Sequence, residues 1–153
     1  MEIFCFDYNN RPYAFSVFMK DTHLIPAGAS VYSMAVSQKN EVYEKFAKDF
    51  DVHFIFNDCM PKIDFYAVPF LSIFAVDSSG GMFSSIGAHT DFESDAKIVY
   101  IAPDRTIFLL ADNGKEFIAN IALWKENMKP FSEVNLFSDI SHAKEKYHFI
   151  ELP

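Results

Sequence analysis

The stretch from residue 69 to residue 128 constrains the fold of this chain most, because apolar runs, turn signals and a helical pattern follow one another there in a clear order. Four short apolar runs predict strands, and they cover residues 70–76, 82–86, 97–102 and 106–111. Two glycines, Gly80 and Gly81, predict a tight reversal after the first strand through their access to positive φ, and residues 103–105 predict a turn before the last. Such short turns between consecutive strands indicate an antiparallel meander.

A helical pattern follows residue 111. Apolar side chains recur there at intervals of three and four residues, at Phe117, Ile121, Trp124 and Met128. Asn113 is a suitable N-cap and Glu116 stands three residues later, so a helix is predicted over residues 113–128. The alternative is a hairpin turn at residues 112–114 followed by a strand over residues 115–121. The apolar stripe continues to Met128, which is long for a strand and favours the helix.

The order of these elements resembles the core of the SUKH superfamily, which includes the yeast cell-wall synthesis regulator and many bacterial toxin-immunity proteins. The matching segments are the strand at 70–76, Asp-Ser-Ser-Gly-Gly at 77–81, Ile-Val-Tyr-Ile at 98–101 and Ala-Asp-Asn-Gly-Lys-Glu-Phe-Ile at 111–118. The chain departs from the superfamily in two ways. The Leu-Pro segment and the helix with Tyr and Phe-Leu that usually precede the sheet are not found, and the first forty or so residues are predicted to form extra strands.

The flanking segments add further elements. Apolar runs at residues 3–8 and 12–19 predict a hairpin around Asn9, Asn10 and Arg11, and residues 22–37 predict a loop with one short strand at 31–36. The remaining expected elements are an amphipathic helix at 40–51, strands at 52–56 and 63–68, a short helix at 141–147 and a tail at 149–153.

We therefore predict a single α+β domain over residues 1–153, with a mostly antiparallel mixed sheet of about six strands packed by a few helices. Its parts are N-terminal strands and a loop at 1–36, a helix at 40–51, the sheet core at 63–111, a helix at 113–128 and a C-terminal segment at 131–153.

The chain is acidic, with 13 Lys and Arg residues against 21 Asp and Glu residues and a formal net charge of −8. This charge works against binding the phosphate backbone of nucleic acids and favours basic partners. The N-terminus lacks the basic region of a secretory signal, and Pro26 and Gly28 interrupt the longest uncharged stretch. We therefore expect a cytoplasmic protein without a membrane-spanning segment, in which Cys5 and Cys59 are reduced core residues.

No residue pattern points to catalysis or to a metal site. The five histidines lack the spacing of a zinc site, and the acidic residues 91, 93 and 95 lack the central glycine and distal glutamate of a calcium loop. The serines at 78–79 and 84–85 lack the Gly-x-Ser-x-Gly pattern of a nucleophile turn, and no Lys-Ser or Lys-Thr follows Gly81 as in a phosphate-binding loop. We expect no enzymatic activity, no metal and no cofactor.

Protein binding is the function that remains, and the resemblance to the SUKH superfamily implies an immunity-type protein that binds and blocks a toxin. Many targets of such proteins are nucleases with basic clefts, to which an acidic inhibitor is steered electrostatically. The predicted partner surface consists of Asp77, Asp91, Phe92, Glu93 and Asp95, with Phe92 as an apolar anchor. This surface requires the turn after residue 76 and the loop over residues 88–96 to lie at one end of the sheet.

Other interpretations stay open. The carboxylates of the predicted surface are also compatible with a plain solvated loop. The chain could instead be a structural or regulatory α+β domain that forms a homodimer or a complex through exposed aromatic side chains of the N-terminal hairpin, so both a monomer and a homodimer are open. A small-molecule enzyme would require a cavity lined by convergent polar groups, which a sequence cannot reveal.

Overall fold

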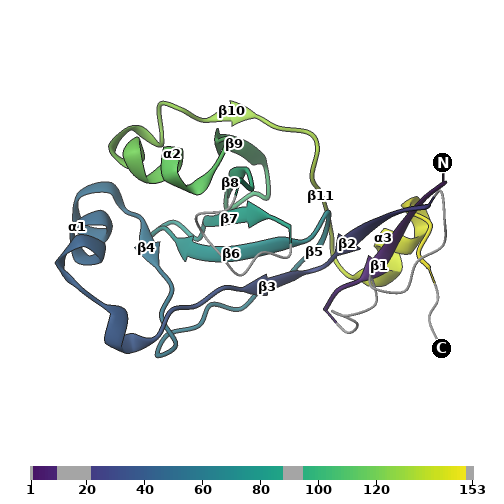
Figure 1. The fold of residues 1–153 in the computed structure, drawn as a ribbon, viewed down its shortest axis with the longest axis horizontal. Helices are drawn as coiled ribbons and strands as arrows, with labels where there is room; N and C mark the ends of the chain where they lie inside the picture. The colour runs from purple at the N-terminus through teal and green to yellow at the C-terminus, as the bar shows by residue number, and fades with distance from the viewer. Residues whose placement is uncertain (1, 10–21, 88–94, 151–153) are drawn as a thin grey trace.

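The computed structural model describes residues 2–9, 22–87 and 95–150, which form an α+β fold (Figure 1). The strands are β1 (Glu2–Asp7), β2 (Thr22–Ala27), β3 (Ala29–Val31), β4 (His53–Phe54), β5 (Tyr66–Val68), β6 (Leu71–Val76), β7 (Met82–Ile86), β8 (Ile98–Ile101), β9 (Ile107–Ala111), β10 (Lys129–Pro130) and β11 (Asn135–Phe137). The α-helices are α1 (Glu41–Phe50), α2 (Gly114–Ala119) and α3 (Ile140–Lys146), and short 3-10 turns are η2 (Val36–Gln38) and η3 (Ile121–Leu123).

The main sheet is built on the predicted meander. Its strand order is β10-β9-β8-β7-β6-β3, and β4 pairs with β6 beside β3. Only β3 runs parallel to its neighbour β6, and the other pairs are antiparallel. The structure therefore confirms the α+β class and the mostly antiparallel mixed sheet, with seven strands where about six were expected.

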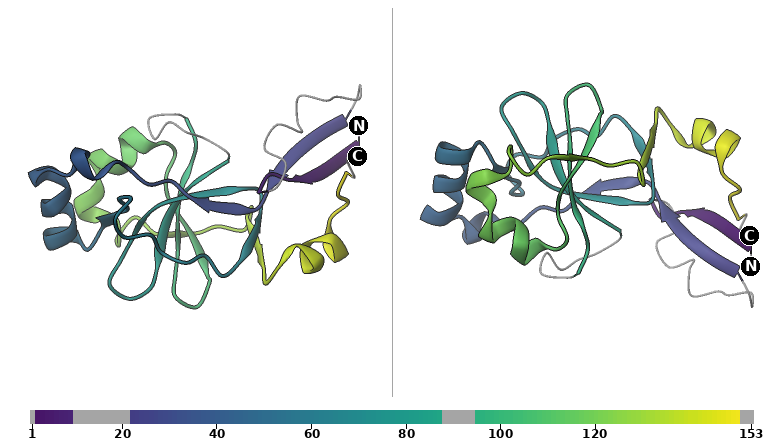
Figure 2. Two further views of the ribbon diagram at one scale, coloured as in Figure 1. Left: turned by 90° about the horizontal axis from the view of Figure 1, so that it is seen from below. Right: turned by 90° about the horizontal axis from the view of Figure 1, so that it is seen from above.

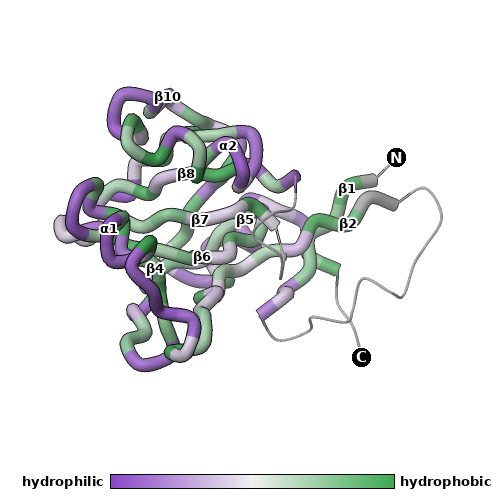
Figure 3. The backbone as a smooth tube through the Cα atoms, turned by 60° about the vertical axis from the view of Figure 1, so that its left-hand side comes forward, coloured by the Kyte–Doolittle hydropathy of each residue, from purple (hydrophilic) through white to green (hydrophobic). Residues whose placement is uncertain are grey.

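Both faces of the main sheet are covered, which explains the unbroken apolar runs of its central strands. On one face, Phe74, Phe83 and Tyr100 form a core with Phe117 and Trp124 from the helical segments. On the other face the alternate residues of the same strands form a second core, which contains Ile73, Met82, Val99, Ile101 and Ile107. Figure 3 shows hydrophobic colours along β6, and hydrophilic colours on much of α1 and near β10.

Helix α1 confirms the helix predicted over residues 40–51. Asn40 caps it, because its side chain accepts hydrogen bonds from the backbone N–H groups of Val42 and Tyr43. Asp51 ends it in the left-handed conformation, with a φ of 59°. Figure 1 places α1 at one end of the molecule, beside β4.

The helix predicted over residues 113–128 begins where expected but is shorter. The Asn113 side chain accepts a hydrogen bond from the Glu116 N–H at 2.8 Å, so the N-cap is confirmed and the alternative hairpin is wrong. Helix α2 ends at Ala119, and both the backbone N–H and the side-chain amide of the next residue, Asn120, donate to the Glu116 carbonyl oxygen. A 3-10 turn follows, and it still directs Ile121 and Trp124 into the core.

The remaining elements form what we call the small lobe: β1, β2, β5, β11, α3 and residues 148–150. Strands β1 and β2 pair in parallel, and residues 148–150 lie against the other edge of β1 through the bridge between Cys5 and Phe149. Strands β5 and β11 pair antiparallel beside α3. Figure 2 shows the small lobe projecting from one end of the main sheet.

The small lobe differs from the sequence prediction: residue 149, predicted to begin a tail, forms a bridge with β1, and the strand predicted over residues 63–68 is shorter, at β5. The neighbour of β1 among the described residues is β2, which lies in the segment predicted as a loop, and the expected second hairpin strand at residues 12–19 lies outside the described residues. Pro26 suggested a loop because it cannot donate to a ladder, yet its carbonyl oxygen still accepts a hydrogen bond from the Phe70 N–H at 2.7 Å. Helix α3 confirms the short helix expected near the C-terminus, and Asp139 caps it.

Candidate functional site

The turn between β6 and β7 is built around Asp77. One carboxylate oxygen of Asp77 accepts hydrogen bonds from the backbone N–H groups of Ser79 and Gly81, at 2.9 and 2.8 Å, and from the Ser79 hydroxyl at 2.8 Å. The other oxygen accepts a hydrogen bond from the Tyr100 hydroxyl. Of the predicted glycine pair, Gly80 takes a positive φ of 97°, whereas Gly81 is needed for space, because a Cβ atom there would collide with the Tyr100 ring.

This arrangement shifts the acidity of both partners. Burial alone would raise the pKa of the Asp77 carboxyl, but the hydrogen bonds from Tyr100, Ser79 and Gly81 outweigh burial and lower its pKa. Burial, and then the hydrogen bond to the negative Asp77 carboxylate, raise the pKa of the Tyr100 hydroxyl to about 12. The Asp77 carboxylate is therefore charged at neutral pH, with one oxygen bonded within its own turn and the other to Tyr100 on β8.

A second carboxylate ties α1 to the same turn. Asp51 accepts a hydrogen bond from the Ser78 hydroxyl at 2.7 Å and from the Ser78 backbone N–H at 3.1 Å, and it contacts the His53 Nε2 atom at 2.8 Å. Burial would raise the pKa of the Asp51 carboxyl, but the hydrogen bonds from Ser78 and His53 lower its pKa overall. We call Asp51, His53, Asp77, Ser78, Ser79 and Tyr100 the Asp51–Asp77 network.

The geometry of this network suits structure rather than catalysis. A serine nucleophile needs a base that accepts its proton, but the Ser78 hydroxyl donates to Asp51 and not to His53. Within residues 2–9, 22–87 and 95–150, no three His, Cys, Asp or Glu side chains gather as a metal site would require.

The predicted partner surface is not brought together as the sequence prediction required. The Asp77 turn joins the end of β6 to the start of β7, whereas Asp95 precedes β8 at the other end of β7, because Met82 pairs with Val76 and Ser85 pairs with Ile98. Strand β7 therefore separates Asp77 from the exposed Asp95. The other three predicted residues, Asp91, Phe92 and Glu93, lie outside the described residues. The expectation that both loops lie at one sheet end is wrong, because antiparallel strands place consecutive turns at opposite ends.

An exposed apolar groove beside β4 was not predicted from the sequence. It has a volume of about 270 Å³, and its lining residues are Lys39, His53, Phe54, Ile55, Phe56, Asp58, Cys59, Met60, Pro61 and Val76. Met60 is 52% exposed at this groove, which we call the Met60 groove. Lys39 reaches across it, because its ammonium group lies 5.3 Å from the centre of the Phe56 ring and 2.6 Å from an Asp58 oxygen.

The two cysteines behave differently from each other. Cys5 is buried as expected, and burial raises the pKa of its thiol to about 11. Cys59 is exposed at the Met60 groove, so the expectation that it is a core residue is wrong. The sequence around Cys59 contains both apolar and polar residues, and only the path of the loop after β4 decides which of them face solvent.

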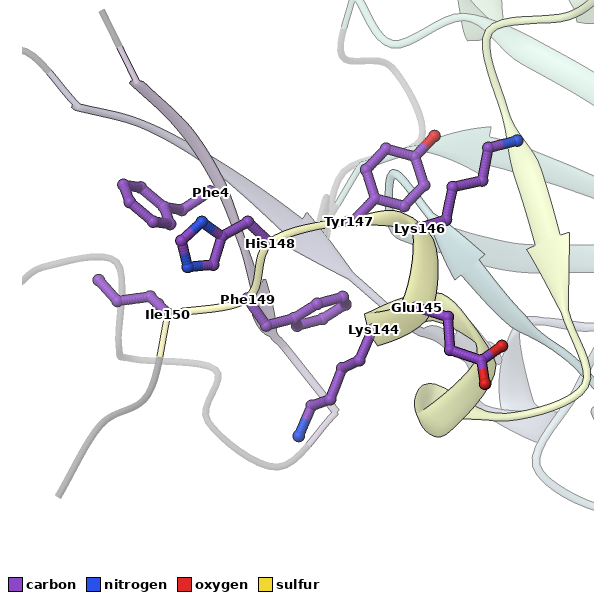
Figure 4. Close-up of a pocket in the computed structure, with 8 residues that line it drawn as sticks. All are labelled: Phe4, Lys144, Glu145, Lys146, Tyr147, His148, Phe149 and Ile150. Carbon is purple, nitrogen blue, oxygen red and sulfur yellow. The ribbon is translucent and has the colours of Figure 1, made fainter.

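A second groove lies on the small lobe, beside the end of α3 (Figure 4). It has a volume of about 750 Å³, and apart from Phe4 the residues that line it are the consecutive residues 144–150. The Phe4 and His148 rings meet edge to face at 4.5 Å. In Figure 4, Lys144 and Lys146 point in different directions, so the groove does not present the converging polar groups of a small-molecule site.

Comparison of the chain with protein-family models, with curated proteins and with solved structures finds no match in any of the three. The resemblance to the SUKH superfamily therefore stays a prediction. Among the helices of the described part of the chain, none is long and apolar enough to cross a membrane.

Proposed function

We propose that this chain is a protein-binding module without enzymatic activity, of the immunity type that binds and blocks a toxin. The Met60 groove carries the proposal, because it exposes the apolar Met60 side chain beside the half-buried Phe54, on a surface bordered by charged groups. Protein interfaces have this composition, with an apolar centre and a polar rim. Val36 and Val42 add exposed apolar side chains on the neighbouring η2 and α1, at 44% and 55% exposure.

The net charge of −8 supports a basic partner. An acidic protein attracts a cationic partner at long range and accelerates its association, whereas the affinity of the final complex depends more on buried apolar contacts. In this proposal the Met60 groove supplies those contacts, and the acidic loop with Asp91, Phe92, Glu93 and Asp95 steers the partner.

The test is a binding titration against the protein encoded by the neighbouring gene, which is a toxin if the proposed function holds. Met60→Glu should weaken binding at least about tenfold, the scale of an interface hot spot. Leu123→Glu is the matched control, because Leu123 is equally exposed at 52% but lies outside the groove. If the wild-type chain does not bind, the proposed function is rejected. If the two variants weaken binding equally, the Met60 groove is rejected as the binding site, but the proposed function is not.

The loop is tested separately. Replacing Asp91, Glu93 and Asp95 by Asn, Gln and Asn should slow association at low salt, because charges outside the interface centre act mainly on the association rate. The difference from wild type should disappear near 1 M salt, where the Debye length is about 3 Å. An unchanged association rate at low salt would remove the loop from the proposal.

A homodimer through the small lobe is the second candidate. The observation that favours it is Ile3 on β1, which is 58% exposed near the groove formed by Phe4 and His148. Size-exclusion chromatography separates the candidates: a stable dimer that Ile3→Glu dissociates supports the homodimer, and a monomer supports the toxin-binding module.

A further inference from the structure

Helix α1 lies at one end of the molecule and packs on β4 and η3. None of its side chains is fully buried, although Tyr43, Phe46 and Phe50 form an apolar stripe that packs on β4 and η3. Figure 1 places α1 at the end opposite the small lobe, outside the main sheet. Elements with this little burial open at a lower free energy than the strands of a core.

Two polar contacts fasten the C-terminal end of α1 to the rest of the fold. The Phe50 carbonyl oxygen accepts a hydrogen bond from the Trp124 indole N–H at 2.7 Å. Directly after the helix, Asp51 accepts hydrogen bonds from the Ser78 hydroxyl and backbone N–H, so its carboxylate connects the helix end to the turn between β6 and β7. The left-handed conformation of Asp51 turns the chain sharply at this point.

We propose that α1 opens and closes as a unit over the aromatic core beneath it, and that Asp51 is the latch that holds it closed. Opening uncovers Phe54, which contacts the Tyr43 and Phe46 rings in the closed state, and the aromatic cluster with Phe74 and Trp124 on which Phe46 and Phe50 pack. Strands β7 and β8 stay paired during this opening, because each has a strand on both sides. The proposal goes beyond the proposed function, because the Met60 groove is already exposed while α1 is closed.

Native-state hydrogen exchange tests the proposal. In the wild type, the amides of α1 should exchange at one common free energy that is lower than that of β7 and β8. Asp51→Gly removes the carboxylate and keeps the left-handed backbone, and Ser78→Ala removes the hydroxyl from the other side of the latch. Each should speed exchange in α1 by about threefold to tenfold, the range for an exposed hydrogen bond to a charged group.

Two controls separate the latch from general effects. Asp49→Asn removes one negative charge from the last turn of α1, as Asp51→Gly does directly after it. It should leave hydrogen exchange in α1 unchanged or make it slower, because a negative charge near the C-terminal end of a helix opposes the helix dipole. Ile101 lies in the core on the face of the sheet away from α1. Ile101→Val should speed hydrogen exchange in β7 and β8. It should leave exchange in α1 unchanged, because the contacts of Ile101 persist when α1 is open.

Equal free energies of exchange for α1, β7 and β8 in the wild type would overturn the separate opening. Exchange in α1 that responds to neither Asp51→Gly nor Ser78→Ala would overturn the latch. If Asp51→Gly fails to fold, Ser78→Ala is sufficient to test the latch. This variant removes a single exposed hydroxyl and keeps the hydrogen bond from the Ser78 backbone N–H to Asp51.

Discussion

The carboxylates of this acidic chain divide into those that cap local structure and those that lie in solvent. Asp77 closes the turn after β6, Asp51 follows α1, and Asp139 caps α3 through the His142 N–H. Asp95 and Asp49 are exposed instead. The carboxylates that hold the fold together still contribute to the net charge of −8, but their oxygens already accept hydrogen bonds within the chain.

This division predicts different effects for two aspartates that the sequence places in the same candidate surface. Asp77→Ala should lower the free energy of unfolding by about 2 to 3 kcal/mol, because the Tyr100 hydroxyl and the Gly81 N–H lose their acceptor. Asp95→Ala should change it by no more than about 0.5 kcal/mol, since Asp95 is exposed. Urea unfolding of the two variants measures the difference, and equal stabilities would contradict the role assigned to Asp77.

The alkaline limit of stability should depend on Tyr100. Its folded pKa of about 12 lies above the ordinary value of 10.0, so the neutral hydroxyl is favoured in the folded state. This contribution is fully present below pH 10 and is lost as the pH rises from about 10 to about 12. Unfolding measured across this range should show a smaller loss of stability for Tyr100→Phe than for the wild type. An identical pH dependence of the two proteins would contradict the raised pKa of Tyr100 in the folded state.

At the scale of elements, the sequence predicts local structure well because its signals are local. Asn113 marks the start of α2 correctly, the apolar spacing over residues 40–51 marks α1, and the apolar runs from residue 70 to residue 111 mark the four meander strands. The early end of α2 was missed, because the apolar stripe continues through the 3-10 turn and Asn120 gives only a weak stop signal. A stripe reports which side chains face the core, and it does not report whether the backbone between them stays helical.

The segment after α2 should nevertheless be as important for stability as a full helix. Trp124 is 4% exposed, packs on Phe83 at 4.8 Å and donates its indole N–H to the Phe50 carbonyl oxygen. Trp124→Ala should therefore lower the free energy of unfolding by about 3 to 5 kcal/mol, through the lost ring and the cavity that it leaves. Thermal and urea unfolding measure the effect. The neighbouring Leu123→Ala, at a residue that is 52% exposed, should stay within about 0.5 kcal/mol, and a similar stability of both variants would contradict this packing.

At the scale of the whole molecule, prediction from the sequence fails where distant segments meet. No local pattern indicates that β1 pairs in parallel with β2, or that residues 148–150 return to β1. The candidate partner surface failed for the same reason, because the strand register decides that Asp77 and Asp95 lie at opposite ends of β7. The exposure of Met60 and Cys59 likewise depends on how the loop after β4 lies on the assembled sheet.

The meeting of the two chain ends should also be the last step of folding. The Cys5 N–H donates to the His148 carbonyl oxygen, and the Ile150 N–H donates to the Cys5 carbonyl oxygen, both at 2.8 Å. These contacts close almost the whole chain into a loop, whereas the meander strands β6 to β9 join neighbours in sequence. Contacts with a large sequence separation carry a higher entropic cost of closure, so the meander should form first.

Folding kinetics can resolve this order. Phe149 is buried at 9% exposure against Tyr66, and Phe149→Leu should destabilise the chain by about 1 kcal/mol through lost packing. Because the chain ends join after the transition state, this variant should unfold faster than the wild type and refold at the same rate. Ile73→Val in β6 removes a buried methyl group at a similar cost, and it should slow refolding because the meander is already paired in the transition state. Slower refolding of Phe149→Leu would mean that the small lobe joins the chain ends early, and the main sheet would then assemble on a loop that is already closed.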